Sequence, residues 1–392
     1  MTEHRSLKRR VRERMSRTGE SYTTAHRHVT GQGRVPGDPA PEPAQHQPSA
    51  LARRLLDAAG LAVSEPMACG LGGGIGFLYA VFEYRQVDQP LLTIVAQHHP
   101  TPWLSAVAEN LGLAIDEVHS SSPNTARQKL DRTLAERGPV QLTVQRGRMP
   151  GHEPDSDLEA ADPHPVAVLG RRDDGYLVQD VGPEPYPVAA DDLVAAWAGH
   201  RKGRFAMASL DAGAVAAMAT DPESLAAGVR RAVRMTVAHL TGPVLGNSFD
   251  VNFGLSGMAK LAHEMADGST KAGWARRFGT PAGSTYACRR LAQCLTSAYT
   301  APGATRPLYA AFLREAAALL DDVVLAEAGD LIAASGEAWT ALAATAAAAA
   351  QGDAAPAEPA VAFAGFAATA GQCRDLEEQA CRVLSSGAGT YT

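Results

Sequence analysis

The sequence predicts an α+β protein in which a mixed domain, over about residues 45–210, is followed by an all-α domain over residues 221–392. Apolar runs of strand length alternate with segments of helical spacing in the first region. From Asp221 onward the strand pattern nearly vanishes and helical spacing remains. The 392 residues include 45 % hydrophobic and 20 % charged side chains, a composition that supports packed cores and excludes wholesale disorder.

The N-terminal segment differs in composition from the rest of the chain. Basic side chains outnumber acidic ones over residues 1–34, and Leu7, Val11 and Met15 recur at the spacing of an amphipathic helix. This basic helical arm could contact nucleic acid or an acidic partner. A second short helix is expected over Tyr22–Val29, with Ser21 as its N-cap. We favour a solvated arm, because two short helices cannot bury a core alone. Residues 35–48 are rich in Pro and Gly and are predicted to form a linker.

The mixed domain is predicted to begin with a helix over Ser49–Ala59, because its leucines share one face and Gly60 follows it. Six apolar runs have strand character: Phe77–Tyr84, Leu91–Ala96, Val140–Val144, Pro165–Leu169, Tyr176–Gln179 and Arg204–Ala208. Three segments between them have helical spacing: Pro102–Leu111, Thr125–Arg137 and Ala190–Ala198. This combination is typical of a mixed α+β domain.

The C-terminal domain is predicted to contain six well-marked helices: Leu225–Leu240, Gly254–Met265, Ser284–Tyr299, Arg306–Leu320, Val323–Ala334 and Trp339–Ala350. Gly or Pro separates most of these segments. Residues 351–359 form a low-complexity Ala/Pro insert that is predicted to be a flexible loop. Phe363–Leu384 is expected to hold one or two further helices.

Charge, cysteines and hydropathy limit the classes of protein that fit. The formal net charge is −6, which argues against a globally basic nucleic-acid binder. Five cysteines form no CxxC pair and cannot all pair with one another, so we expect reduced thiols and a cytoplasmic location. No apolar run approaches the length of about 20 residues that a membrane span needs, and the N-terminus is too charged for a signal peptide.

A glycine-dense string, GLGGGIGF over residues 70–77, is the most distinctive local feature. Such glycines allow positive φ or a close approach to another group. A phosphate cradle is one interpretation, but the predicted order here is helix, loop, strand, and no Lys-Ser/Thr follows. We therefore favour a structural turn.

A strand, turn and strand follow between His164 and Asp180. Paired antiparallel strands of that length bring the two side chains close together, and a carboxylate beside an imidazole supports general-base chemistry. On spacing alone, an ordinary hairpin with polar ends is favoured. Four other histidines, His98, His99, His119 and His152, lack metal-ligand spacing and are interpreted as surface residues, so we expect no metal and no cofactor.

Several of these features occur together in a known family. The relevant segments are His46-Gln47-Pro48-Ser49-Ala50-Leu51, Leu61–Glu65, the GLGGGIGF string, and the strands with His164 and Asp180. They resemble the N-terminal domain of the BtrH family, named for an acyltransferase of butirosin (aminoglycoside antibiotic) biosynthesis; that domain is similar to papain-like cysteine peptidases. Residues 253–257, 274–278 and 306–313 resemble the helical domain of unknown function that usually follows it. The resemblance covers about residues 45–346, and the glycine string and the paired-domain layout are its specific parts.

The resemblance implies a papain-like domain and acyl transfer. A carrier-protein thioester would deliver its acyl group to a cysteine at a helix N-terminus, and an amine would then take it to form an amide. In that scheme His164 is the base and Asp180 its orienting partner. The family motif has Cys where this chain has Gln47. An amide cannot act as nucleophile, but it can donate a hydrogen bond to an acyl oxygen.

Candidates for substrate contact surround this position: His46, Ser49, Cys69, Gly72, Gly73 and Gly74. Ser49 lies roughly 200° round the helix from Gln47, so it cannot simply replace the cysteine. Cys69 could enter the same pocket, but a small buried hydrophobic residue is the favoured interpretation.

Three functional hypotheses remain. An amine could attack a thioester directly, with His164 as general base and Gln47 polarising the carbonyl. Alternatively, the domain binds a carrier protein or peptide without catalysis, or the chain is a ligand-sensing regulator whose arm contacts DNA.

The expected partners are an acyl carrier protein or peptide and a small-molecule amine, with nucleic acid only through residues 1–34 and no membrane. Seven basic residues would suit docking of an acidic carrier protein, or form a solvated face: Arg146, Arg148, Arg171, Arg172, Arg201, Lys202 and Arg204.

Overall fold

The computed structural model describes residues 46–83, 89–150, 152, 162–181, 184–351 and 358–386. The chain divides into two units, Met1–Pro43 and Ala44–Thr392, and every described element belongs to the second. The predicted basic arm and most of the predicted linker lie outside the described residues, as do residues 352–357 of the Ala/Pro insert.

Two helices begin the fold. Helix α3 (Gln47–Ala58) starts after His46, whose extended backbone makes it the N-cap, and Pro48 fits the first turn because no N–H is needed there. Its buried face includes Leu51 and Leu55. Helix α4 (Glu65–Leu71) is capped by Ser64, whose hydroxyl accepts a hydrogen bond from the N–H of Met67. The glycine string therefore begins inside a helix.

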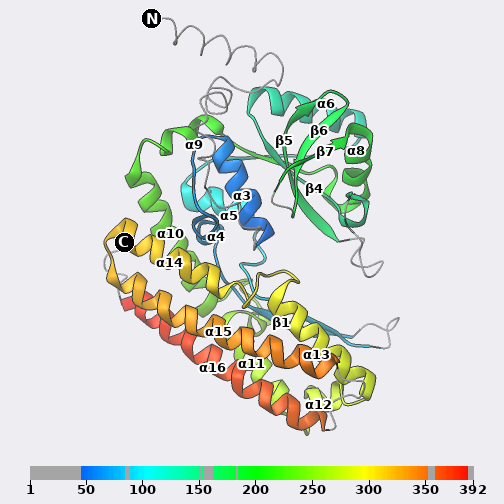
Figure 1. Ribbon diagram of the computed structural model, residues 1–392, viewed down its shortest axis with the longest axis vertical. Coiled ribbons are helices and arrows are strands. Elements are labelled where there is room, and N and C mark those ends of the chain that lie inside the picture. Colours follow the sequence, from blue (N-terminus) through cyan, green and yellow to red (C-terminus); the bar gives the residue numbers. More distant parts are fainter. Residues whose placement is uncertain are drawn as a thin grey trace, which may run out of the picture. The chain divides into compact units, whose positions relative to one another are not determined.

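The larger sheet has six antiparallel strands in the order β3-β8-β4-β5-β6-β7. They are β3 (Ile115–Val118), β4 (Val140–Gln145), β5 (Pro163–Arg172), β6 (Gly175–Gln179), β7 (Tyr186–Ala189) and β8 (Met207–Leu210). Helices α6 (Pro123–Glu136) and α8 (Ala190–Gly199) cover one face (Figure 1), where they bury Val166 and Val168 of β5. Because strand side chains alternate between faces, Ala167 instead joins the core around α3, which packs against β5.

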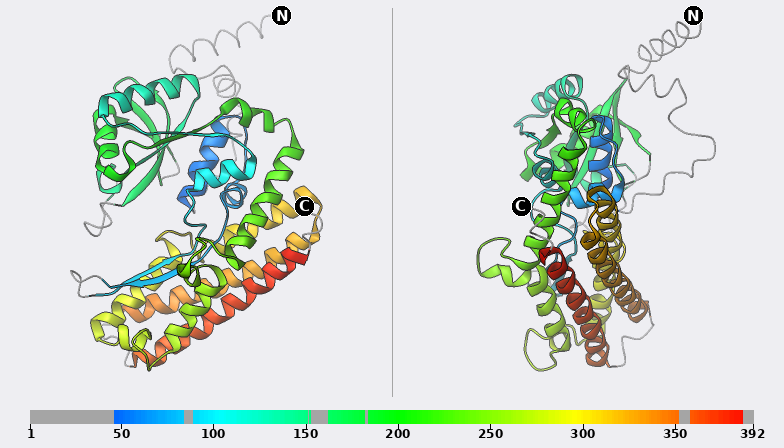
Figure 2. Two further views of the ribbon diagram at one scale, coloured as in Figure 1. Left: turned by 180° about the vertical axis from the view of Figure 1, so that it is seen from behind. Right: turned by 90° about the vertical axis from the view of Figure 1, so that its left-hand side faces the viewer.

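A separate two-stranded ribbon pairs β1 (Leu78–Phe82) with β2 (Leu91–Val95). This ribbon contacts two helices of the C-terminal region, α11 (Gly254–Ala266) and α13 (Pro281–Thr296), as Figure 2 shows. The remaining helices are α5 (Trp103–Leu111), α9 (Ala212–Met218), α10 (Pro222–Thr241), α12 (Trp274–Arg277), α14 (Arg306–Leu320), α15 (Val323–Gln351) and α16 (Pro359–Ser386). Three short 3₁₀ helices complete the described elements: η1 (Arg146–Arg148), η2 (Arg201–Gly203) and η3 (Ser248–Asn252).

The predicted fold class is confirmed: a mixed region with an antiparallel sheet precedes an all-helical region. Two predicted helices, Val323–Ala334 and Trp339–Ala350, are in fact the single helix α15, and Phe363–Leu384 lies in the single helix α16. The sequence patterns also missed β3, β7 and α4. All five cysteines are free and buried. Among the helices of the described residues, none combines the length and apolar character that a membrane crossing requires.

Candidate functional site

The β5–β6 hairpin brings His164 and Asp180 together, as the sequence predicted. The two strands pair with Ala167 opposite Gln179, and His164 lies near the start of β5 while Asp180 follows the end of β6. The Nε2 atom of His164 is 2.6 Å from Oδ1 of Asp180, and both residues are almost fully buried. A hydrogen bond of this kind fixes the imidazole tautomer: Nε2 carries the proton and Nδ1 is the basic nitrogen.

Asp180 is the centre of a hydrogen-bond network. Its two oxygens accept hydrogen bonds from the side chains of His164, His152, Gln47 and Tyr186 and from the N–H of Val181. Burial alone would raise the pKa of Asp180, but the hydrogen bonds from His152 and His164 outweigh it and hold the pKa well below its usual range. Burial and the neighbouring Asp180 carboxylate raise the pKa of Tyr186. Asp180 is therefore an anion at neutral pH.

Gln47 is the first residue of α3 and points into this network. Its amide nitrogen lies 2.9 Å from the carbonyl oxygen of Pro165, 3.2 Å from Oδ1 of Asp180 and 3.2 Å from Nε2 of His164. Because Nε2 of His164 donates to Asp180, the two hydrogens of the amide are directed at the two oxygens. In this arrangement Gln47 ties α3 to both strands of the hairpin.

His46 and Ser49 lie on a different side of α3 from Gln47. The hydroxyl of Ser49 is 2.7 Å from Nδ1 of His46, and Nε2 of His46 is 2.6 Å from the amide oxygen of Gln97. Burial lowers the pKa of His46 to about 4, although the hydrogen bond to Gln97 opposes this. The structure therefore places Ser49 away from the His164–Asp180 pair, as its position round the helix predicts.

Comparison with protein families divides the described chain in two. Residues 46–181 match the family described as butirosin biosynthesis protein H, N-terminal (BtrH_N), and residues 201–384 match a domain of unknown function, DUF4872. The chain is a BtrH_N domain followed by a DUF4872 domain. A search of curated proteins finds no match. The BtrH_N match begins at His46 and ends one residue after Asp180, so it includes Gln47, His152 and His164.

Cys69 lies on the Ser49 side of the BtrH_N domain. It is fully buried, and burial raises the pKa of its thiol to about 12, although a hydrogen bond with Ser49 opposes this. A thiol in such surroundings stays protonated at neutral pH and is a poor nucleophile. This agrees with the interpretation of Cys69 as a small buried residue.

The glycines proposed to contact substrate are buried against the protein's own rings. A Cβ added to Gly72 would lie 2.0 Å from the indole nitrogen of Trp103, and one added to Gly73 would lie 2.5 Å from the ring of His98. At Gly74 the neighbour is the ring of Tyr309, at 2.3 Å. Gly73 and Gly74 also have φ values of +93° and +63°. These features support the structural turn that the sequence favoured.

The interpretation of four histidines as surface residues is wrong for His98. It is buried and stacks on His239, with ring centroids 4.3 Å apart, and burial lowers its pKa to about 3. Residues His99 and His119 are exposed, as predicted. The surface interpretation is also wrong for His152, whose side chain is only 9 % exposed and lies beside Asp180, a position that no spacing pattern indicated.

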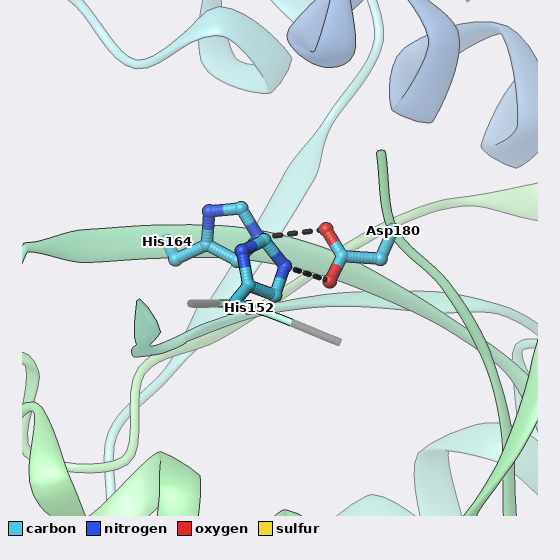
Figure 3. A group of neighbouring side chains, drawn as sticks. All are labelled: His152, His164 and Asp180. Carbon is cyan, nitrogen blue, oxygen red and sulfur yellow. Dashed lines mark hydrogen bonds and ion pairs between the residues drawn. The ribbon is translucent and has the colours of Figure 1, made fainter. Parts of the chain in front are cut away.

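Sequence reasoning missed both His152 and Tyr186 as parts of the site. His152 follows η1 in the connection before β5, and Tyr186 begins β7. The donor atoms of His152, His164 and Asp180 all lie within 4.8 Å of one another (Figure 3). Within the described residues, these three side chains are the group that could hold a metal ion.

Proposed function

We propose that the chain catalyses acyl transfer from a carrier-protein thioester to an amine by direct attack, without an acyl-enzyme. The buried His164–Asp180 pair beside the N-terminus of α3 is the observation that carries this proposal. In the reaction the amine nitrogen forms a bond to the thioester carbon, and the carbon–sulfur bond breaks. The amine loses a proton to the imidazole, and the departing thiolate of the carrier takes up a proton.

His164 is suited to this role because of how Asp180 holds it. With the proton on Nε2 directed at Asp180, Nδ1 is free to accept a proton from the attacking amine. Figure 3 shows Nδ1 on the side of the ring that faces away from Asp180. The ionised carboxylate then stabilises the imidazolium that forms, as in other His–Asp pairs. His164 is therefore the general base, and Asp180 is a positioning residue.

The N-terminus of α3 favours negative charge that develops on the thioester oxygen. First-turn N–H groups have no acceptor inside a helix, and the helix dipole adds partial positive charge there. The side chain of Gln47 begins at this end, and its amide polarises the carbonyl when it turns from Pro165 to the acyl oxygen.

An acidic carrier protein would dock on exposed basic residues of this region: Arg148, Arg172, Arg201, Lys202 and Arg204.

A second candidate function is binding of a carrier protein or peptide without catalysis. One observation favours it: in the structure both amide hydrogens of Gln47 are directed at Pro165 and Asp180, so the network is complete without substrate. The regulator hypothesis depends on residues 1–34, which lie outside the described residues.

An assay of amide formation distinguishes these two functions. Acyl-carrier thioesters and a panel of amines would be incubated with the protein in the presence of a chelator, and amide would be detected by mass spectrometry. We expect His164→Ala to lower the rate at least about 100-fold, the usual size of a general-base contribution. His119→Ala, at an exposed histidine, serves as the matched control. A protein that forms no amide across the panel would support the binding function instead.

Replacing Gln47 with the residue expected from the resemblance gives a second test. We expect Gln47→Cys to acquire a covalent acyl group from the thioester, seen as an added mass on the intact protein, because the introduced thiol lies beside His164. Background acylation of the native cysteines should be low, since burial raises the pKa of Cys69 to about 12 and of Cys288 to about 11. The same substitution combined with His164→Ala should lose the adduct. An adduct that persists would show that the imidazole does not activate this position.

A further inference from the structure

His152 has no role in the acyl-transfer scheme, yet it forms a hydrogen bond with one of the two carboxylate oxygens of Asp180, the residue that positions His164 in that scheme. Its Nε2 atom is 2.7 Å from Oδ2 of Asp180, while His164 binds the other oxygen. Figure 3 shows both imidazoles directed at the same carboxylate. A positioning carboxylate needs only one imidazole, so the second one requires another explanation.

We propose that His152, His164 and Asp180 form a binding site for a divalent transition-metal ion, with Zn²⁺ as the preferred ion. Two imidazole nitrogens and a carboxylate are a recognised ligand set for catalytic zinc, in which a fourth position stays open. The three side chains come from the connection before β5, from β5 itself and from the end of β6. No spacing pattern along the sequence relates these three residues, and it is the fold that brings them together.

The distances fit this ion with small movements. Zinc binds imidazole nitrogen and carboxylate oxygen at about 2.0–2.2 Å, so its tetrahedral ligands lie about 3.3 Å apart. The present separations of 2.6 Å and 2.7 Å between imidazole nitrogen and carboxylate oxygen need to increase by less than about 1 Å. The donor atoms all lie within 4.8 Å of one another, so the widest separation needs to shorten by up to about 1.5 Å. Side-chain rotation supplies movements of this size.

Charge also favours metal binding. The pKa of Asp180 is held well below its usual range by the hydrogen bonds of His152 and His164, which outweigh its burial, so its carboxylate is an anion that attracts a divalent cation. The side chains are 9 %, 5 % and 2 % exposed, which limits competition from water. The hydroxyl of Tyr186 and the N–H of Val181 also donate hydrogen bonds to the carboxylate and hold it in place, as partners of metal ligands commonly do.

Metal binding and the His164–Asp180 hydrogen bond exclude each other, because both use Nε2 of His164. The inference does not rest on acyl transfer, since binding is measured without any substrate. The amide assay contains a chelator, so a result without amide would not contradict the metal proposal. Equally, a protein that binds no metal would not contradict the acyl-transfer proposal.

The experiment uses full-length protein stripped of metal with a chelator. Zn²⁺ binding would be measured by calorimetry, and Co²⁺ binding by its visible absorption, which reports tetrahedral coordination. We expect one tight site in the wild type and in His119→Ala, the exposed control. We expect His152→Ala to weaken binding more than about 100-fold, because loss of a residue behind a ligand already costs about 10–100-fold. All variants retain the histidines of residues 1–45, so binding there does not contribute to the difference.

A conservative variant separates a metal ligand from a structural residue. His152→Cys supplies a thiolate at the same position, so we expect Co²⁺ binding to persist with a new sulfur-to-metal absorption band. Circular dichroism of the metal-free proteins would establish that each variant is folded. Wild-type affinity equal to that of folded His152→Ala, or Co²⁺ bound by His152→Cys without the sulfur band, would overturn the proposal.

Discussion

Gln47 determines which chemistry remains open to the His164–Asp180 pair. A cysteine at the start of α3 would supply a nucleophile, whereas the longer amide reaches across to Pro165 and Asp180 and joins the helix to the hairpin. The amide is neutral and does not titrate, so the carboxylate keeps its charge and both imidazoles keep a hydrogen-bond acceptor. In the functions proposed above, Gln47 therefore leaves the pair suited to base catalysis or to metal binding rather than to covalent catalysis.

Two buried histidines outside this network make the stability of the protein sensitive to acid. Burial lowers the pKa of His46 to about 4 and of His98 to about 3, from an ordinary value of 6.5. The unfolded chain therefore takes up protons first as the pH falls, so the stability contributed by each neutral histidine is complete above pH 6.5 and is lost below it. At about pH 5 the loss is about 2 kcal/mol for each histidine.

We expect His98→Leu to reduce the difference in unfolding free energy between about pH 8 and about pH 5 by about 2 kcal/mol. The ring nitrogens of His98 have no hydrogen-bond partner among the described residues, so little is lost by removing them. Urea denaturation at the two pH values measures the effect. His119→Leu, at an exposed site, is the control and should leave the difference unchanged. An unchanged difference in His98→Leu would contradict this account.

At the scale of elements, the turn between α4 and β1 depends on close packing as well as on backbone freedom. Gly73 and Gly138 have the same φ of +93°, but a Cβ on Gly73 would meet the ring of His98, whereas one on Gly138 meets nothing within 4 Å. A left-handed backbone costs an L residue about 1–2 kcal/mol in either place. Substitutions at Gly73 and Gly138 therefore distinguish the cost of backbone strain from the cost of crowding against a neighbouring ring.

We expect Gly138→Ala to lower the unfolding free energy by about 1–2 kcal/mol. Gly73→Ala should lower it by a further 1–3 kcal/mol or so, the usual cost of overpacking a core. Chemical denaturation of both variants measures the difference. Equal losses in the two variants would mean that the ring of His98 moves aside without cost.

The elements that the sequence failed to predict share physical causes. Strands β3 and β7 are the two edges of the sheet, and edge strands are short and carry residues such as Asp116 and Pro187 that central strands avoid. The break expected in α15 is absent because Gly336 instead allows close packing against Pro307, 2.9 Å from where a Cβ would lie. Local patterns describe how a segment behaves alone, and these segments are determined by their neighbours.

The same distinction applies to the site. The hairpin geometry of His164 and Asp180 follows from strand length and a turn, and Gln47 was found through the family resemblance. His152 reaches the carboxylate only because the connection before β5 folds back on the sheet, which no periodic pattern encodes. Sequence alone therefore predicted that His164 and Asp180 lie close together and missed His152 as their neighbour.

At the scale of the whole described region, the two matched domains share one core. Side chains from α3, α4 and α5 pack with side chains from α10, α14, α15 and α16. Arg306, at the start of α14, connects the two domains through hydrogen bonds. Its guanidinium is fully buried and forms a bidentate pair with Glu377. It also donates to the carbonyl oxygens of Gly76 and Ala96 in the BtrH_N domain and to that of Ala304. Every N–H of this side chain is therefore satisfied.

Arg306→Met should destabilise the protein by about 3–5 kcal/mol, because it leaves the carboxylate of Glu377 buried without its positive partner. Arg314→Met is the matched control, since Arg314 pairs with Asp330 on an exposed surface where such pairs contribute about 0–1 kcal/mol. Urea denaturation would give the free energies. Because the core is shared, scanning calorimetry should show one transition for residues 46–386 in the wild type, shifted to lower temperature in Arg306→Met. Two separate transitions, or equal losses in the two variants, would show that the domains fold independently of this contact.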